Sequence, residues 1–450
     1  MKCKKILTAL LAAACTMSGC HGDLDIMQDN KLSASNMWID ESDAETATYG
    51  IYLYTRDALK SVHDIYLCWG EFRNGLWGAG TNKTLSGVDQ TQVRTSTMSS
   101  SNAYADWSVM YKTVNQANLI LKHVPEMGIS ESVRNFSLGN AYFSRAWCYF
   151  WIARIWGDAP LALTGYESTA GDLYLPRAPK AEIFARIESD LTEAERYVTD
   201  NSDKAVATPA AVQMLKADYA LWMYRVAGGG SSYLTMAEKA IEALNLSASR
   251  LESDYAQVFS SANKLNKEVI FAFSCLTEDG SSIKISNQFY SYNHPNKGSY
   301  NYRPAGDVMT MYADNDLRKE VSITTLDNLN FVNKYPSGQT GSDPVVISRL
   351  AEMYLISAEA QGLNGGLDRL NELREKRGLD RVSPGNEADF LDAVLQERRL
   401  EFLAEGFRWY DLVRTGKATQ TLGTKDYQCL MPLPSRELPV SYTHLRAHET

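Results

Sequence analysis

The sequence lacks the local motifs that mark several common classes of enzyme. It contains no G-x-S-x-G, no H-E-x-x-H, no Walker loop and no G-x-G-x-x-G after a strand, which argues against serine hydrolases, zinc proteases, P-loop ATPases and dinucleotide enzymes. Its carboxylates form no recognisable local pair for glycoside hydrolysis. These absences favour a protein without catalytic activity.

Paired cysteines and an excess of positive charge are also missing. The seven cysteines are widely scattered, so they form neither a disulfide framework nor a zinc spacing. The chain has 45 basic and 54 acidic residues and a formal net charge of −9, which argues against nucleic acid as a partner. His444 and His448 have the spacing of a metal pair, but they lie in the segment 441–450, which looks foreign to the fold. We therefore expect no metal, no cofactor and a non-native tail.

The apolar run at the N-terminus, Ile6–Cys15, is too short to span a bilayer as a permanent anchor. Three lysines precede this run, and small residues then lead into Cys20. This order is typical of an export signal, and small residues directly before a cysteine resemble a lipobox. We expect residues 1–19 to be a lipoprotein signal peptide and Cys20 to be the lipidated N-terminus. A plain signal peptide cut elsewhere is the alternative.

Helical patterning dominates the chain from Asn102 onward. Helix pairs of about 12 to 20 residues with Ala, Tyr and Leu at packing positions resemble tetratricopeptide hairpins, although no strict repeat is visible. The fold class that we expect is mostly α, with a tetratricopeptide-like scaffold of helical hairpins. The expected helices cover residues 103–123, 133–156, 181–198, 208–226, 234–246, 346–361, 367–376 and 388–405.

The pattern changes near Lys267. A short β-prone run over 268–274 is followed by a stretch rich in Asn, Gly, Ser, Tyr and Asp, which indicates a loop-rich insertion with few strands. No linker-like segment divides the chain. We therefore expect a single unit over 20–440, with an N-terminal helical part over 20–266, the insertion over 267–345 and a C-terminal helical part over 346–440.

Charged residues near position 400 have helical spacing and resemble an active-site cluster at first sight. Residues three and four apart on a helix can pair, and further charges from the preceding helix can join them. We interpret the group as a network of ion pairs that fixes helix register rather than as a catalytic site. Its expected members are Arg349, Glu352, Glu359, Arg398, Arg399, Glu401, Glu405 and Arg408.

Motifs in several segments, taken in order along the chain, resemble the SusD/RagB family of surface lipoproteins that bind nutrients. The first is R-A-x-x-Y-F-x(5)-W-G-D-x-P-L within Phe143–Leu161. The later ones lie within Lys334–Ala360, Asp368–Gly378, Glu397–Arg414 and Leu433–Glu437. The resemblance extends over residues 20 to about 440, and it implies that the charged network is structural.

The resemblance also implies a function. A member of this family would be a non-catalytic, lipid-anchored protein on the outer face of the outer membrane, where it captures oligosaccharides and delivers them to a SusC-like TonB-dependent transporter. Peptide capture for the same class of transporter is an alternative. A secreted glycoside hydrolase and a pure protein-interaction scaffold are less favoured alternatives.

Candidate ligand contacts come from two segments that mix aromatic and polar side chains, residues 66–78 and 288–303. Aromatic rings stack on the apolar faces of sugars, while amide, carboxylate and guanidinium groups bind hydroxyls. The resemblance implies that loops from these two regions form the ligand face. The predicted ligand-binding residues are Trp69, Arg73, Asn74, Trp77, Tyr290, Tyr292, Tyr300 and Tyr302.

Overall fold

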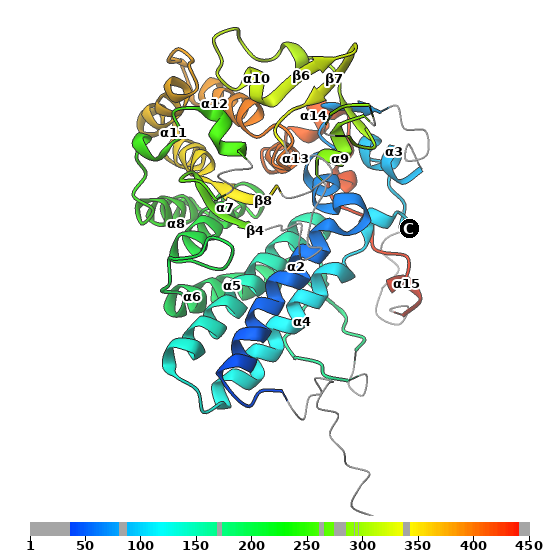
Figure 1. Cartoon of the computed structure of the whole chain (residues 1–450), viewed down its shortest axis with the longest axis vertical. Coiled ribbons are helices and arrows are strands. Elements are labelled where there is room, and N and C mark those ends of the chain that lie inside the picture. Colours follow the sequence, from blue (N-terminus) through cyan, green and yellow to red (C-terminus); the bar gives the residue numbers. More distant parts are fainter. Residues whose placement is uncertain are drawn as a thin grey trace, which may run out of the picture. The chain divides into compact units, whose positions relative to one another are not determined.

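The computed structural model in Figure 1 describes residues 37–80, 88–168, 173–260, 265–273, 285–291, 293–295, 297–335 and 343–440. The chain divides into two units, Met1–Ile39 and Asp40–Thr450, and every element below lies in the second. The signal peptide, Cys20 and the tail over 441–450 fall outside the described residues, and the domain boundaries stay a prediction. None of the described helices combines the length and the apolar character that crossing a bilayer requires.

Helix α2, Glu41–Gly70, begins at a reciprocal cap. The Asp40 carboxylate accepts a hydrogen bond from the backbone N–H of Asp43 at 3.1 Å, and the Asp43 carboxylate accepts one from the Asp40 N–H at 3.3 Å. The stretch belongs to the expected N-terminal helical part, but no individual helix was expected here, because the outward face of α2 also carries apolar side chains such as Tyr49 and Leu53, which hides the amphipathic period. The segment 66–78 is therefore helical up to Gly70 rather than a loop.

Helical hairpins follow α2 and form the scaffold. Their helices are α4 (Ser108–His123), α5 (Glu131–Trp156), α6 (Lys180–Tyr197), α7 (Pro209–Val226) and α8 (Ser231–Glu242). In Figure 1, α2, α4 and α5 lie side by side, and α6 packs on α5 and α8 on α7. The starts and ends of these helices agree with the sequence expectation to within five residues.

Helix α5 is the centre of this scaffold. From Ser137 to its last residue every side chain except Tyr142 is buried, as expected for a helix that packs against neighbours on all sides. It ends at Gly157, whose φ of 78° is a conformation that favours glycine. The chain then forms strand β2, Ala159–Pro160, which pairs antiparallel with β3, Arg177–Ala178.

Two further strands join the insertion to the C-terminal helices. Strand β4, Val269–Phe273, pairs antiparallel with β8, Val345–Arg349, which runs directly into helix α11, Leu350–Lys376. The expected helix over 346–361 is therefore wrong for its first four residues, because these β-prone side chains continue the buried ladder with β4. Helix α11 contains both helices predicted here and kinks at Gly362, where φ is 66°.

The insertion carries short strands, as the sequence predicted. Strand β1, Trp77–Ala79, pairs with β5, Tyr302–Pro304, and this ladder brings the two predicted ligand segments side by side. Strands β6 (Ile323–Leu326) and β7 (Leu329–Val332) form a hairpin. The other α-helices among the described residues are α3 (Val88–Thr95), α9 (Ser286–Phe289), α10 (Lys319–Ser322), α12 (Glu387–Glu401), α13 (Arg408–Arg414), α14 (Ala418–Leu422) and α15 (Glu437–Val440).

A buried network of ion pairs holds the insertion against the C-terminal helices. The Glu401 carboxylate accepts hydrogen bonds from Arg377 Nη2 at 2.8 Å, from Arg318 Nη1 at 3.0 Å and from Arg349 Nη1. Arg349 also donates to Glu405 at 2.9 Å. All of these side chains are at most 3% exposed. The predicted structural network is confirmed around Glu401.

Other members of the predicted cluster have different surroundings. Arg398 pairs with Asp411 at 2.8 Å, while Arg399 pairs at the surface with Asp307. Arg408 donates to a backbone carbonyl at 3.5 Å. Helix α12 ends at Glu401, four residues earlier than expected, because Ala404 and Gly406 have φ of 65° and 90° and turn the chain. The prediction of one helix through Glu405 was therefore wrong.

Candidate functional site

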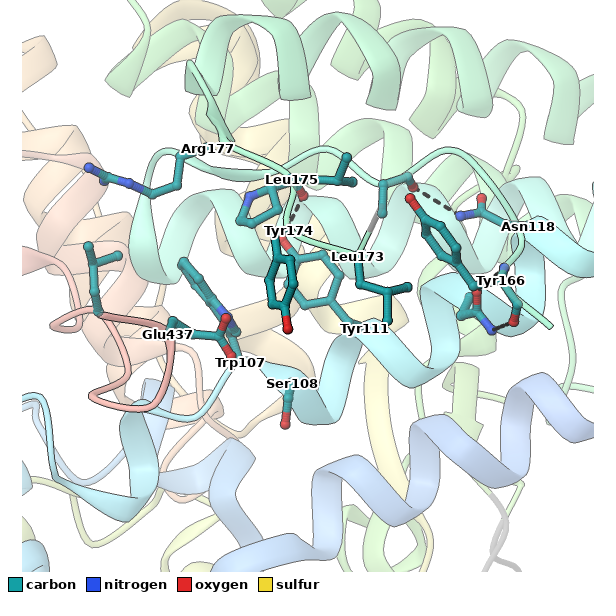
Figure 2. A pocket seen from close by; sticks show the side chains of 14 residues that line it. Trp107, Ser108, Tyr111, Asn118, Tyr166, Leu173, Tyr174, Leu175, Arg177 and Glu437 are labelled. Carbon is teal, nitrogen blue, oxygen red and sulfur yellow. Dashed lines mark hydrogen bonds between the residues drawn. The ribbon is translucent and has the colours of Figure 1, made fainter. Parts of the chain in front are cut away.

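A pocket of about 290 Å³ lies where α4 faces the segment between α5 and α6 and the end of the described chain (Figure 2). Segments that are far apart in the sequence form its walls. The fourteen lining residues are Trp107, Ser108, Tyr111, Asn115, Asn118, Pro160, Ala162, Tyr166, Leu173, Tyr174, Leu175, Arg177, Leu433 and Glu437.

Side chains of α4 hold one wall of the pocket in place. The Tyr111 hydroxyl donates to the Pro160 carbonyl at 2.7 Å, and the Asn118 amide donates to the Ala162 carbonyl at 3.0 Å. Asn115 exchanges hydrogen bonds with the backbone of Tyr166, at 3.0 Å and 2.8 Å. The described residues between Pro160 and Arg177 have no regular secondary structure, so these side chains satisfy backbone groups that no ladder would pair. The wall is therefore preformed.

The floor of the pocket is aromatic. The rings of Trp107 and Tyr111 meet edge to face with centroids 6.2 Å apart, and Trp107 meets Trp156 in the same way at 6.1 Å. The Trp156 indole N–H donates to the Ala105 carbonyl at 3.1 Å, which fixes this stack. Burial raises the pKa of Tyr111 well above its ordinary value, so its hydroxyl stays neutral. The floor thus offers apolar ring surface.

The mouth of the pocket carries exposed apolar side chains. Tyr174 is 60% exposed and Leu173 is 43% exposed. In Figure 2, Tyr174 extends from its segment across the pocket, with Leu173 beside it. A ring that is largely exposed at the mouth of an aromatic pocket is suited to contact with a ligand.

Charged groups lie at one end of the pocket. Figure 2 shows Arg177 and Glu437 on the same side, away from Asn118 and Tyr166. Glu437 stands in this wall because the segment before it is anchored: the Met431 N–H donates to the Ile155 carbonyl at 2.7 Å. The pocket therefore combines flat apolar surface with one cation and one anion at one end. In the part of the chain that the structure describes, no group of three or more His, Cys, Asp or Glu side chains could hold a metal ion.

Two of the predicted ligand residues of the early segment surround a buried carboxylate instead. The side chains of Trp77 and Asn74 donate to Glu71 Oε1 at 3.2 Å and 3.0 Å. The same carboxylate accepts the backbone N–H groups of Ala404 and Gly406 at 3.1 Å and 2.9 Å. Burial raises the pKa of Glu71 to about 7, although these hydrogen bonds lower it. Trp77 and Asn74 thus help to join the end of α2 to the turn after α12.

The other two predicted residues of that segment are also buried. The Trp69 indole N–H donates to the Tyr104 carbonyl at 2.8 Å. The Arg73 guanidinium lies over the Trp409 ring, 3.9 Å from its centroid. Burial lowers the pKa of Arg73 to about 10, which leaves the side chain charged at neutral pH. The exposed fraction of these side chains is 0% and 2%, so both pack inside the protein.

The predicted residues of the insertion form a similar buried cluster. The Tyr290 hydroxyl donates to Asn333 at 3.1 Å, and the Tyr300 hydroxyl donates to the Asn330 carbonyl at 2.7 Å. Tyr302 stacks on Phe72, with centroids 3.4 Å apart. Each of the three tyrosines is at most 2% exposed. The fourth predicted residue, Tyr292, lies outside the described residues.

The two predicted segments therefore meet, but their described candidate side chains face inward. Their role as ligand contacts stays a prediction, and burial gives them a packing role in this structure. Sequence reasoning did not point to the pocket of Figure 2. The available signal was the apolar triplet Leu173–Leu175, which stands in a stretch without helical or strand periodicity.

Comparison with known proteins agrees with this fold. The sequence model described as "SusD family" matches residues 324–437, and the model described as "Starch-binding associating with outer membrane" matches residues 79–222. SusD-like protein P38 of Formosa agariphila is 24% identical over an alignment of 477 positions, gaps included, which covers 92% of each chain. The chain belongs to the SusD/RagB family. SusD-family proteins are non-catalytic binding proteins, so the expectation that this SusD-like protein is not an enzyme is confirmed.

Solved structures confirm the tetratricopeptide-type helical fold of this SusD-like protein. Bacteroides fragilis NanU is 25% identical and superposes with a TM-score of 0.77, covering 91% of this chain and 97% of its own. Surface glycan-binding protein A of Bacteroides thetaiotaomicron, solved in complex with laminarihexaose, is 18% identical with a TM-score of 0.75 and coverage of 90% and 98%. The second comparison supports the fold alone.

Proposed function

We propose that this SusD-like protein binds oligosaccharides at the cell surface and delivers them to a SusC-like TonB-dependent transporter. The observation that carries the proposal is the pocket of Figure 2, in which an exposed tyrosine stands over an aromatic floor. Its support is the family's description as starch-binding and associated with the outer membrane, together with the laminarihexaose complex of a protein with the same fold.

The chemistry of the pocket suits a sugar ring. The C–H face of a sugar can stack on Tyr174 or Tyr111, and hydroxyls can bind the polar groups of Ser108 and the charged end. A protein that passes its ligand on must also release it quickly. We therefore expect modest affinity, roughly micromolar or weaker.

The anchor and the partner belong to the same proposal. Lipidation of Cys20 would hold the protein at the outer membrane, facing outward, and the support for it is the lipobox-like sequence after a basic and apolar segment. The transporter is inferred from the resemblance to the family. Both follow from the proposed role as a surface capture protein.

The test is a calorimetric titration of the purified chain with a panel of oligosaccharides and peptides. Stacking on an exposed ring contributes about 0.5–1.5 kcal/mol, so Tyr174→Ala should weaken binding by about 2- to 13-fold. Tyr427→Ala is the matched control, because Tyr427 is 71% exposed and does not line the pocket. Equal affinity in both variants would exclude this pocket as the site.

A peptide ligand is the second candidate. The pocket is mainly apolar, and Arg177 and Glu437 present opposite charges at one end, a combination that also suits an apolar side chain beside a peptide backbone. Binding of peptides but of no oligosaccharide in the same panel would establish this alternative. A panel without any binding would contradict the capture role itself.

A further inference from the structure

A second cleft lies at the opposite end of α5 from the pocket of Figure 2. It has a volume of about 380 Å³ and is bounded by the first turns of α2 and α5 and by the turn after α6. With a rise of 1.5 Å per residue, the stretch of α5 from Phe136 to Trp156 separates the two places by about 30 Å along the helix. The two hollows are therefore distinct.

Tyrosine rings form one wall of this second cleft. Tyr49 is 51% exposed, and its ring lies 5.7 Å from that of Phe136. Tyr197 is half-buried and stacks on Tyr142, with centroids 6.1 Å apart and planes within 6°. Because their neighbours hold these rings in place, a ligand that stacks on them costs little side-chain entropy.

Polar residues line the same cleft, and several of their side chains have no internal partner among the described residues. Among the described residues, the side chains of Glu45, Asn135 and Thr199 make no hydrogen bond, and all three line the cleft. Asp200 lines it too, and its carboxylate accepts hydrogen bonds from the N–H and hydroxyl of Ser202, each at 2.9 Å. The cleft thus offers carboxylate, amide and hydroxyl groups beside its rings.

A buried amide stands at the cleft as well. Asn140 is 1% exposed, and its Oδ1 accepts the Ala207 N–H at 3.0 Å and the Tyr52 hydroxyl. Its Nδ2 donates to the Phe136 carbonyl at 2.7 Å. Asn140 therefore ties α5 to the backbone at Ala207 and holds this part of the cleft in place.

We propose that this cleft is a second carbohydrate site, for neutral glycans with adjacent hydroxyl groups. Carboxylates and amides bind such hydroxyls while tyrosine rings take the apolar face of the sugar. None of the described residues that line the cleft is Lys or Arg, and Glu45 and Asp200 make it acidic, so glycans with carboxylate or sulfate groups are repelled. The ligand class rests on the proposed function, but the position of the site does not.

Two sites on one chain would change how a polymer is held. A long glycan that contacts one site raises the effective concentration of its other segments near the second, and overall binding strengthens without any new contact. The pocket of Figure 2 differs because its described lining includes a cation, Arg177. The two sites therefore differ in their tolerance of acidic ligands.

Fluorine NMR of the purified chain labelled with 3-fluorotyrosine tests the second site. The resonances of Tyr49, Tyr54 and Tyr174 are assigned by their loss in the corresponding Phe variants. Laminarihexaose should shift the Tyr49 and Tyr174 signals with separate saturation curves. Tyr54 is the internal control, since it is 46% exposed on the same helix as Tyr49 but lines neither hollow.

Each outcome decides between the two sites. The second site is supported if laminarihexaose shifts the Tyr49 signal and Asn135→Ala weakens the affinity read from that saturation curve by about three- to tenfold. The saturation curve of Tyr174 should stay unchanged in this variant. A shift of the Tyr174 signal alone overturns the second site and leaves the pocket of Figure 2 as the ligand site. A shift of the Tyr49 signal alone overturns the pocket of Figure 2 and leaves the second site. An acidic uronic hexasaccharide that shifts Tyr49 as strongly overturns the charge argument. No response to any oligosaccharide of the panel overturns both sites.

Discussion

Replacing Glu401 by Gln tests whether the buried network of ion pairs stabilises the fold. The substitution keeps the size of the side chain but removes its charge from between Arg318, Arg349 and Arg377. It also places an amide N–H₂ among guanidinium donors, where only acceptors are useful. Glu401→Gln should therefore lower the free energy of unfolding.

The size of the loss in unfolding free energy depends on which carboxylates stay paired with each arginine. Removing one partner of a buried ion pair costs about 3–5 kcal/mol, because a charge is left without compensation. Here Arg318 keeps Asp316 and Glu397, Arg349 keeps Glu405, and Arg377 keeps Glu268. No cation is left wholly unpaired, so we expect the lower end of the range, about 3 kcal/mol.

The pH dependence of the free energy of unfolding provides a second test of the network. Burial by itself would raise the pKa of Glu401, but the charges of Arg377, Arg349 and Arg318 lower it well below its ordinary value of 4.5. A carboxylate with a lowered pKa stabilises the folded state above its unfolded pKa, and this contribution is lost as the pH falls towards the folded pKa. The difference between wild type and Glu401→Gln should be full at pH 7 and shrink below about pH 4.5.

Urea unfolding followed by tryptophan fluorescence measures this difference, with the slope checked for each variant. Asp368→Asn is the matched control, because it removes a pair with Arg381 whose side chains are 83% and 49% exposed. That variant should unfold like the wild type, since exposed pairs contribute little. An equal midpoint for Glu401→Gln and the control would refute the reasoning.

Two further predictions concern the residues around Glu71. Trp77→Ala should lower the free energy of unfolding by about 3–5 kcal/mol, because it opens a cavity in the core. Loss of ligand binding at unchanged stability would instead support the predicted role of Trp77 as a ligand contact. Since burial raises the pKa of Glu71 to about 7, its ionisation opposes folding, and this cost is absent below about pH 4.5 and complete above about pH 7. Wild type should therefore lose stability relative to Glu71→Gln over this range in urea titrations, and a constant difference would contradict the assignment.

Local signals were sufficient to predict most helices but not all. Helix α7 was predictable because Thr208 caps it, accepting from the Ala211 N–H at 3.1 Å, and Pro209 occupies its first turn. Helix α2 was missed because tertiary packing, not a clean apolar stripe, sets its faces. Strand β8 was read as a helix because its pairing with β4 is a contact between distant segments.

The site was harder to predict than the fold for a physical reason. Aromatic composition does not reveal whether a ring is buried: Trp69 is fully buried and Tyr174 is 60% exposed, although both stand in segments with apolar neighbours. The pocket also joins lining residues that lie within 107–118, 160–177 and 433–437, and no local sequence pattern indicates that these segments meet. The motifs of the family, by contrast, fall on the scaffold, as Glu401 and Arg377 show.

The anchored segment that carries Leu433 and Glu437 has a consequence for folding. It lies far from α4 and α5 in the sequence, so its contact with them closes a long loop, and we expect that contact to form late. Until the Met431 N–H meets the Ile155 carbonyl, the aromatic floor has one side missing. The pocket is thus completed only after the helices that support it have formed.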